Sequence, residues 1–151
     1  MRRISSAVHI AATPDQVWGV LTDFARFPEW NPFLIAAEGR LVPGARLTLR
    51  LRLPDSGREM TFTPTVLESR PGRLLRWRGR LGVPGVFDGV HTFELSAQHQ
   101  GTQVLQSEVF SGFLVPLSGS IINPSERGFT ALTDALKARV ESIHAPVSPG
   151  E

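Results

Sequence analysis

His91, Gln106 and Glu108 are the polar residues of this sequence whose spacing could bring them together to do chemistry. They lie in two segments, 86–97 and 102–110, that alternate between apolar and polar residues as β-strands with one buried face do. All three fall on the more apolar face. Because burying such groups without partners is unfavourable, we expect them to contact one another or a bound molecule.

The length of the turn between these two segments decides which residues face each other. A two-residue turn at His99–Gln100 places His91 opposite Glu108, whereas a turn at Gln100–Gly101 places His91 opposite Phe110. Both registers keep the same parity, so both predict one inner face. Its members are His91, Phe93, Leu95, Val104, Gln106, Glu108 and Phe110.

Three interpretations of this polar group stay open at the level of sequence. In the first, His91 and Glu108 satisfy each other as a structural cross-strand pair. In the second, the polar side chains orient a bound ligand. In the third, His91 and Glu108 are candidate catalytic residues that act as an acid–base pair in apolar surroundings.

Other kinds of reactive site are not indicated. The sequence has no cysteine, which excludes disulfides and thiolate chemistry. His9, His91, His99 and His144 show no metal-ligand spacing, and neither a phosphate-binding loop nor a nucleophile elbow is present. We therefore expect no metal and no cofactor.

The charge pattern favours a solvated surface. The net charge is only +2, and Arg46, Arg50, Arg52, Arg76, Arg78 and Arg80 alternate with apolar residues, which predicts that they line the outer face of a sheet. An anionic partner for that face stays open, but no aromatic residues are interleaved for base stacking, so we expect no nucleic acid. Neither a signal peptide nor an apolar run of about 18 residues is found. These features predict a cytoplasmic protein without stable membrane insertion.

Two short helices are predicted near the N-terminus. Thr13, Pro14 and Gln16 have the spacing of a capping box with proline in the first turn. The segment 24–33 follows, with an aromatic residue at every third position, which is typical of a tight helical turn. Its aromatic residues are Phe24, Phe27, Trp30 and Phe33.

The remaining chain predicts an antiparallel sheet and one long helix. Short turns separate the strand segments, so parallel crossovers are excluded. Apolar residues at spacings of three and four then predict a C-terminal helix, with Asn123–Pro124 kinking it or starting a new one. The expected strands are 3–10, 33–41, 47–53, 59–69, 73–80, 86–97 and 102–110, and the helical stripe is Phe129, Leu132, Leu136, Val140 and Ile143. This is an α+β design of about seven strands around a long helix.

These residues resemble the START-like superfamily, also called SRPBCC, whose members have the helix-grip fold. The resemblance is carried by residues 10–33, IAATPDQVWGVLTDFARFPEWNPF, with a second match in 89–95 and 107–117. It is closest to the bacterial polyketide cyclase/dehydrase-like branch and implies one domain at 1–144, followed by a flexible tail at 145–151. It also implies a hydrophobic ligand cavity between the curved sheet and the C-terminal helix.

The resemblance and the strand parity together give a set of candidate ligand-binding residues. Phe24 and Phe27 are expected to cap the interior, and Trp30 and Phe33 to stand at the cavity mouth. Gly112 and Gly128 are candidates for a close helix–sheet approach or for a hinge near the mouth. The candidates are Trp30, Phe33, Leu49, Leu51, Met60, Phe62, Leu75, Trp77, His91, Phe93, Gln106, Glu108, Phe110, Phe129 and Leu132.

The expected function is the binding of a hydrophobic small molecule, namely a lipid, a polyketide or an aromatic metabolite. The first alternative is a cyclase- or dehydratase-like enzyme that uses His91 or Glu108 as its acid–base group. The second is a protein-interaction module. The sequence leaves a homodimer open.

Overall fold

The computed structural model of the chain describes residues 1–81 and 85–144, and the tail expected at 145–151 lies outside them. Within these residues the strands form two antiparallel sheets, of five and of three strands. The five-stranded sheet has the order β1-β8-β7-β6-β5, and the three-stranded sheet has the order β2-β3-β4. The strands are β1 (Arg2–Ile10), β2 (Leu34–Glu38), β3 (Thr48–Arg52), β4 (Glu59–Phe62), β5 (Thr65–Arg70), β6 (Leu74–Leu81), β7 (Phe87–Gln98) and β8 (Gly101–Ser111).

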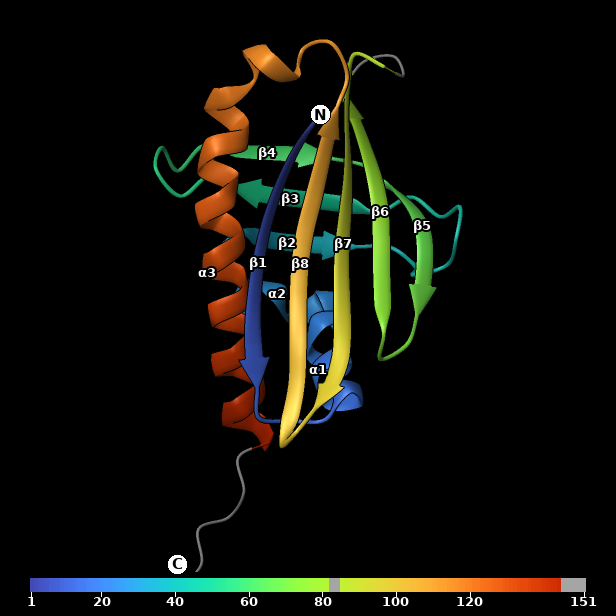
Figure 1. The fold of residues 1–151 in the computed structure, drawn as a ribbon, viewed down its shortest axis with the longest axis vertical. Coiled ribbons are helices and arrows are strands. Elements are labelled where there is room, and N and C mark those ends of the chain that lie inside the picture. Colours follow the sequence, from blue (N-terminus) through green and yellow to red (C-terminus); the bar gives the residue numbers. More distant parts are fainter. Residues whose placement is uncertain (82–84, 145–151) are drawn as a thin grey trace, which may run out of the picture.

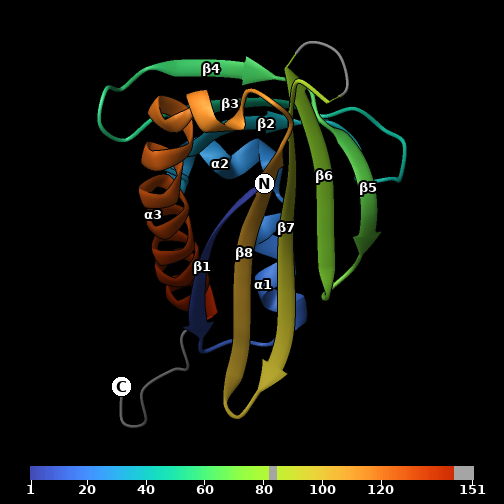
Figure 2. The same cartoon turned by 45° about the horizontal axis from the view of Figure 1, so that its top comes forward.

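The two sheets and the long helix α3 (Gly119–His144) surround the interior. Figure 1 shows α3 running alongside β1, and Figure 2 shows the three-stranded sheet crossing one end of the five-stranded sheet. This arrangement confirms the α+β helix-grip fold predicted from the sequence. It leaves one end of the interior bounded by the three-stranded sheet, while α3 runs along its side, as Figure 1 and Figure 2 show.

The prediction of a single strand at 59–69 is wrong, because the chain changes direction at Pro64. β4 ends at Phe62 and joins the small sheet, whereas β5 starts at Thr65 and joins the large one. Pro64 has no N–H for a strand ladder. Its carbonyl instead accepts a hydrogen bond from the Leu47 N–H at 2.9 Å, which holds the corner in place.

The helix α1 (Pro14–Leu21) begins where the capping box predicts. The Gln16 N–H donates to Thr13 Oγ1 at 3.2 Å, and the Thr13 N–H donates to Gln16 Oε1 at 3.0 Å. The short helices η1 (Phe24–Arg26) and α2 (Phe27–Trp30) follow. Phe24 and Phe27 are buried with ring centroids 5.1 Å apart, as expected for residues that cap the interior.

No new helix starts at Pro124, because α3 already begins at Gly119, after the short helix η2 (Val115–Leu117), and continues through the proline. The carbonyl left without its usual N–H partner belongs to Ser120, which is exposed to water. Ile143 is 53% exposed, so it does not belong to the buried stripe. The other predicted stripe residues, Phe129, Leu132, Leu136 and Val140, are buried.

Close packing between α3 and Phe33, the residue before β2, depends on Gly128. A Cβ atom at this position would overlap the ring of Phe33, so only glycine lets the helix approach the ring in this way. Phe33 in turn packs edge-on against Phe129, with ring centroids 5.5 Å apart. The expectation of a close approach at Gly128 is therefore confirmed.

Glu141 fastens the C-terminal half of α3 to the chain that follows β1. Its Oε2 accepts hydrogen bonds from Lys137 Nζ at 2.7 Å and from the Ala11 N–H at 2.9 Å. The hydrogen bond from Lys137, followed by that from Ala11, lowers the pKa of Glu141 from its ordinary value of 4.5. Because the folded-state pKa is the lower one, this stabilisation is present above about pH 4.5 and is lost as the pH falls through the folded-state pKa.

We therefore expect Glu141→Gln to lower the free energy of unfolding by about 1 kcal/mol at pH 7. The difference from the parent should shrink at pH 3, because lowering the pH shifts the parent carboxyl toward its protonated form. Urea denaturation at both pH values measures this, with Glu126→Gln at an exposed position of the same helix as the control. An equal loss at both pH values would contradict the assignment.

Candidate functional site

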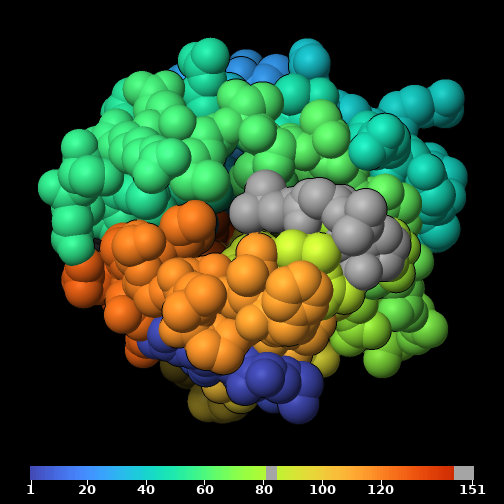
Figure 3. Space-filling model, turned by 90° about the horizontal axis from the view of Figure 1, so that it is seen from above, coloured from blue at the N-terminus to red at the C-terminus, as the bar shows by residue number. Residues whose placement is uncertain are grey.

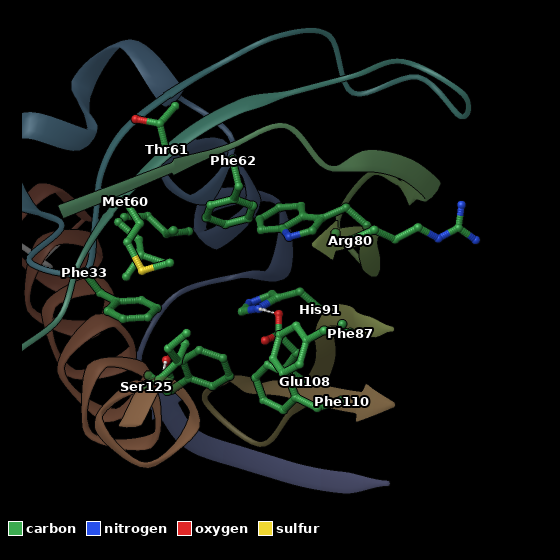
Figure 4. A pocket seen from close by; sticks show the side chains of 17 residues that line it. Phe33, Met60, Thr61, Phe62, Arg80, Phe87, His91, Glu108, Phe110 and Ser125 are labelled. Carbon is green, nitrogen blue, oxygen red and sulfur yellow. Dashed lines mark hydrogen bonds and ion pairs between the residues drawn. The ribbon is translucent and has the colours of Figure 1, made fainter. Parts of the chain in front are cut away.

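A cavity of about 120 Å³ lies between the inner face of the five-stranded sheet, the three-stranded sheet and the N-terminal half of α3. Figure 3 shows the surface hollowed between the green β3–β4 region and the orange start of α3, and Figure 4 shows the side chains around the hollow. The lining is mostly aromatic and aliphatic. It consists of Phe33, Leu34, Leu51, Met60, Thr61, Phe62, Trp77, Gly79, Arg80, Phe87, Gly89, His91, Glu108, Phe110, Ile121, Ser125 and Phe129.

Two glycines facing each other create part of this space. Gly79 on β6 pairs directly with Gly89 on β7, and both line the cavity. A Cβ atom on Gly79 would come no closer than 3.7 Å to Phe62, and one on Gly89 no closer than 3.4 Å to Glu108. Because neither position is crowded, these glycines leave room for a ligand and are not required by tight packing.

The hairpin of β7 and β8 brings His91 opposite Glu108, as the two-residue turn at His99–Gln100 predicts. Gln100 has a φ of 59°, the left-handed conformation that such turns use. His91 Nδ1 lies 3.2 Å from Glu108 Oε1. The predicted cross-strand pair is therefore formed, and it lies in the wall of the cavity.

Aromatic rings hold the His91 imidazole on several sides. It stacks on Trp77 with centroids 4.9 Å apart and planes at 12°, and the ring of Phe129 lies 4.9 Å away at 69°. His91 is only 3% exposed, whereas the Glu108 side chain keeps 18% of its surface exposed. Figure 4 shows the pair projecting from the sheet toward the hollow.

His91 Nε2 is buried without a hydrogen-bond partner among the described residues. An ionised carboxylate can only accept, so Glu108 selects the tautomer with its proton on Nδ1. Nε2 of the neutral ring then carries a lone pair. The arrangement can accept a hydrogen bond from a ligand, or take a proton from one.

Over residues 1–141 the chain matches the family described as polyketide cyclase / dehydrase and lipid transport. It is a member of this family. The START-like resemblance predicted from the sequence is thereby confirmed, and solved START-like structures share the fold. No curated protein matches the chain.

Several solved structures are similar to this family member at low sequence identity. The Zhui aromatase/cyclase from Streptomyces sp. R1128 is 19% identical, with a TM-score of 0.75 over 95% of this chain and 96% of that one. Protein MLL2253 from Mesorhizobium loti is 21% identical, with a TM-score of 0.74 over 96% and 100% of the two chains. A START superfamily protein from Mycobacterium smegmatis is 20% identical, with a TM-score of 0.71 over 93% and 98%.

Most of the ligand-binding residues predicted for this family member come together around the cavity. They are Phe33, Leu51, Met60, Phe62, Trp77, His91, Glu108, Phe110 and Phe129. The structure places the other candidates elsewhere. Leu49, Leu75, Phe93, Gln106 and Leu132 are buried but do not line the cavity.

Trp30 does not stand at the cavity mouth, which corrects the expectation for this residue. It borders a shallow surface depression together with Pro28 and Arg52. Its ring packs against Phe27 with centroids 5.3 Å apart. The regular spacing of the aromatic residues could not show that the chain turns between Trp30 and Phe33. The side chain of Asn31 makes that turn, because its Oδ1 accepts from the Phe33 and Leu34 N–H groups at 3.1 and 2.9 Å.

Some lining residues were missed, although the strand parity contains a signal for part of them. Counting back by two from His91 gives Gly89 and Phe87, and counting forward by two from Trp77 gives Gly79. The remaining lining residues reach the cavity because of how the three-stranded sheet and α3 pack, and the alternation of residues along one strand carries no information about that packing. They are Leu34, Thr61, Arg80, Ile121 and Ser125.

The arginines expected on one outer sheet face are divided between the two sheets. Arg50 and Arg52 lie on β3 beside Glu59, at 3.7 and 3.2 Å, and Arg76 lies on β6, 3.4 Å from Glu68. Such exposed pairs contribute little to stability. The prediction that these arginines share one basic face is therefore wrong.

Two further observations concern the part of the chain that the structure describes. No helix there is both long and apolar enough to cross a membrane. No three histidine, aspartate or glutamate side chains are grouped there as a metal site would require.

Gln106 is fully buried, and neither its side-chain oxygen nor its nitrogen has a partner among the described residues. We expect Gln106→Met to raise the free energy of unfolding by about 1 kcal/mol, because a chain of similar shape removes two unpaired polar atoms. Gln106→Glu, the matched control, should lower it by more than that. Chemical denaturation measures both, and a destabilised Gln106→Met variant would show that the amide has a bound partner.

Proposed function

We propose that the chain binds an apolar small molecule in the cavity between its two sheets and α3. The observation that carries this proposal is the hollow of about 120 Å³ beside Gly79 and Gly89, walled by apolar side chains. Protein interiors are normally packed without such spaces. Membership of a family described by polyketide cyclase / dehydrase and lipid transport supports a role in ligand binding or in cyclase-type chemistry.

The His91–Glu108 pair is a fixed polar group in the mostly apolar wall of the cavity, so it could orient a bound ligand. It is fixed by the β7–β8 register and by the stack on Trp77, so it does not need to be ordered when a ligand enters. Burial of apolar ligand surface would supply most of the affinity. The pair would decide which end of the ligand enters first.

A second candidate is an enzyme of the cyclase or dehydratase kind. It is favoured by the unpartnered Nε2 of a histidine whose Nδ1 is held by a carboxylate. In this role His91 would take a proton from an acidic C–H or O–H group of the substrate, while the aromatic walls hold the substrate in a folded shape. The solved neighbour named as an aromatase/cyclase supports this candidate through its fold alone.

Gly79→Val tests whether the cavity binds ligand. The variant should fold, because a β-branched residue suits a strand and the nearest side-chain atom is 3.7 Å from the added Cβ. It should lower the affinity for toluene at least about tenfold by filling the hollow. Fluorescence of Trp77 in the cavity wall reports binding, and Gly19→Ala on the exposed side of α1 is the control. Unchanged toluene binding by a folded Gly79→Val variant would exclude this cavity as the site.

His91→Ala separates the carrier from the enzyme. If the chain is an enzyme, the kcat for a poly-β-carbonyl thioester should fall about 100-fold or more, with a smaller change in KM. If it is a carrier, native mass spectrometry should show the same co-purified apolar ligand on the parent and on the variant. Turnover that is insensitive to His91→Ala would rule out His91 as the base.

A further inference from the structure

We infer that the cavity selects a ligand with one flat aromatic ring that carries a hydrogen-bond donor, of which phenol is the simplest example. The donor would bind His91 Nε2, and the Gly79–Gly89 pair would set the size of the ring. This inference rests on the proposed function and narrows it to a class of ligand. Size, wall shape and the polarity of the lining each point to it.

The volume is that of a single ring. The cavity measures about 120 Å³. A protein cavity of roughly 150 Å³ holds benzene, so the second ring of a two-ring ligand would have to displace side chains or extend out through the opening. The walls are suited to ring faces and edges, because they include Phe33, Phe62, Trp77, Phe87, Phe110 and Phe129.

The two glycines make one part of the wall flat. Gly79 and Gly89 lie opposite each other on neighbouring strands, so bare backbone faces the hollow there. The next pair along the same strands is Trp77 and His91, whose rings are stacked. A methyl group on Gly89 would lie 3.4 Å from Glu108 and 3.6 Å from Phe110, which is contact without serious overlap. It would therefore take space from the ligand and leave the protein packing largely unchanged.

His91 and Glu108 present acceptors in the lining, which also contains the indole N–H of Trp77 and the hydroxyl of Thr61. With its Nδ1 proton directed at Glu108, His91 presents the lone pair of Nε2, and the ionised Glu108 presents only oxygens. The Ser125 hydroxyl already donates its proton to the Ile121 carbonyl at 2.8 Å. Arg80 turns out of the hollow in Figure 4, and its Nε lies 3.4 Å from Asp88 Oδ1.

The acceptors of the His91–Glu108 pair discriminate between ligands by charge and by hydrogen-bonding type. A phenolic hydroxyl can donate to His91 Nε2, which satisfies an atom that is otherwise buried and unpaired. A carboxylate such as benzoate would meet Glu108 without a compensating cation and should be rejected. An ether such as anisole has the shape but lacks the donor.

The test is an NMR titration of the parent chain with phenol, toluene, anisole, benzoate and 1-naphthol, followed through the amide signals of Gly79 and Gly89. Ring currents of a bound ring should shift both signals. Phenol is expected to bind about tenfold more tightly than anisole, and 1-naphthol to bind more weakly than phenol despite its larger apolar surface. Benzoate should produce no shift at these two glycines.

Two variants assign the roles of the residues. His91→Phe keeps an aromatic ring on Trp77, so toluene affinity should stay within about threefold while the phenol-to-toluene affinity ratio falls about tenfold. Comparing this ratio between the parent and the variant cancels the free-energy cost of removing each ligand from water, because that cost is the same for both proteins. Gly89→Ala should weaken phenol by about fivefold or more, with Gly19→Ala as the control that binds phenol as the parent does.

The outcomes separate this inference from the proposed function. If toluene shifts the two glycine signals but His91→Phe leaves the phenol-to-toluene ratio unchanged, the donor-selective site is refuted and the apolar cavity stands. Tighter binding of 1-naphthol than of phenol refutes the single-ring size limit. If none of the ring compounds shifts Gly79 or Gly89, the cavity does not take such ligands and the proposed function fails with the inference.

Discussion

The register of the β7–β8 hairpin is the constraint on which the site depends. A slip of one residue would turn every inner side chain to the outside, so the two-residue turn at His99–Gln100 decides which groups the cavity contains. The same register passes to β6, where it aligns His91 with Trp77 and Gly89 with Gly79. One turn therefore sets the polar pair, the stacked ring beneath it and the glycine pair next to it.

The hollow persists because the structure supports it from two directions. At the corner made by Pro64 the chain leaves the three-stranded sheet for the large one, so β4 ends at Phe62 over the cavity and does not continue beside β6. On the other side, Gly128 lets α3 approach Phe33 closely, and the Phe33 ring packs against Phe129 of the same helix. A ligand that binds in the hollow would add to the stability of the folded chain.

The features that could be predicted from the sequence are those that depend on neighbours along the chain or across one tight turn. The capping box at Thr13 and Gln16, the inner face of β7 and β8, and the pairing of His91 with Glu108 are of this kind. The division of the sheet at Pro64 was not predicted, because Thr residues on both sides of the proline favour a continuous strand. The positions of Trp30 and Gln106 relative to the cavity depend on how separate elements pack, and residue spacing does not carry that information.

The polar pair also joins two environments, and this bears on both candidate functions. Glu108 keeps part of its surface in contact with water, while His91 lies almost wholly among aromatic rings. The hydrogen bond between them therefore connects the solvent to the ligand side of the imidazole. In a carrier this arrangement keeps Nε2 a fixed acceptor, because Nδ1–H donates to the Glu108 carboxylate. In an enzyme, when Nε2 takes up a proton, the Nδ1 proton can pass to Glu108 and from there to water, so the cavity does not have to open. The two functions consequently need the same geometry, and what separates them is whether the bound molecule has a proton acidic enough to give up.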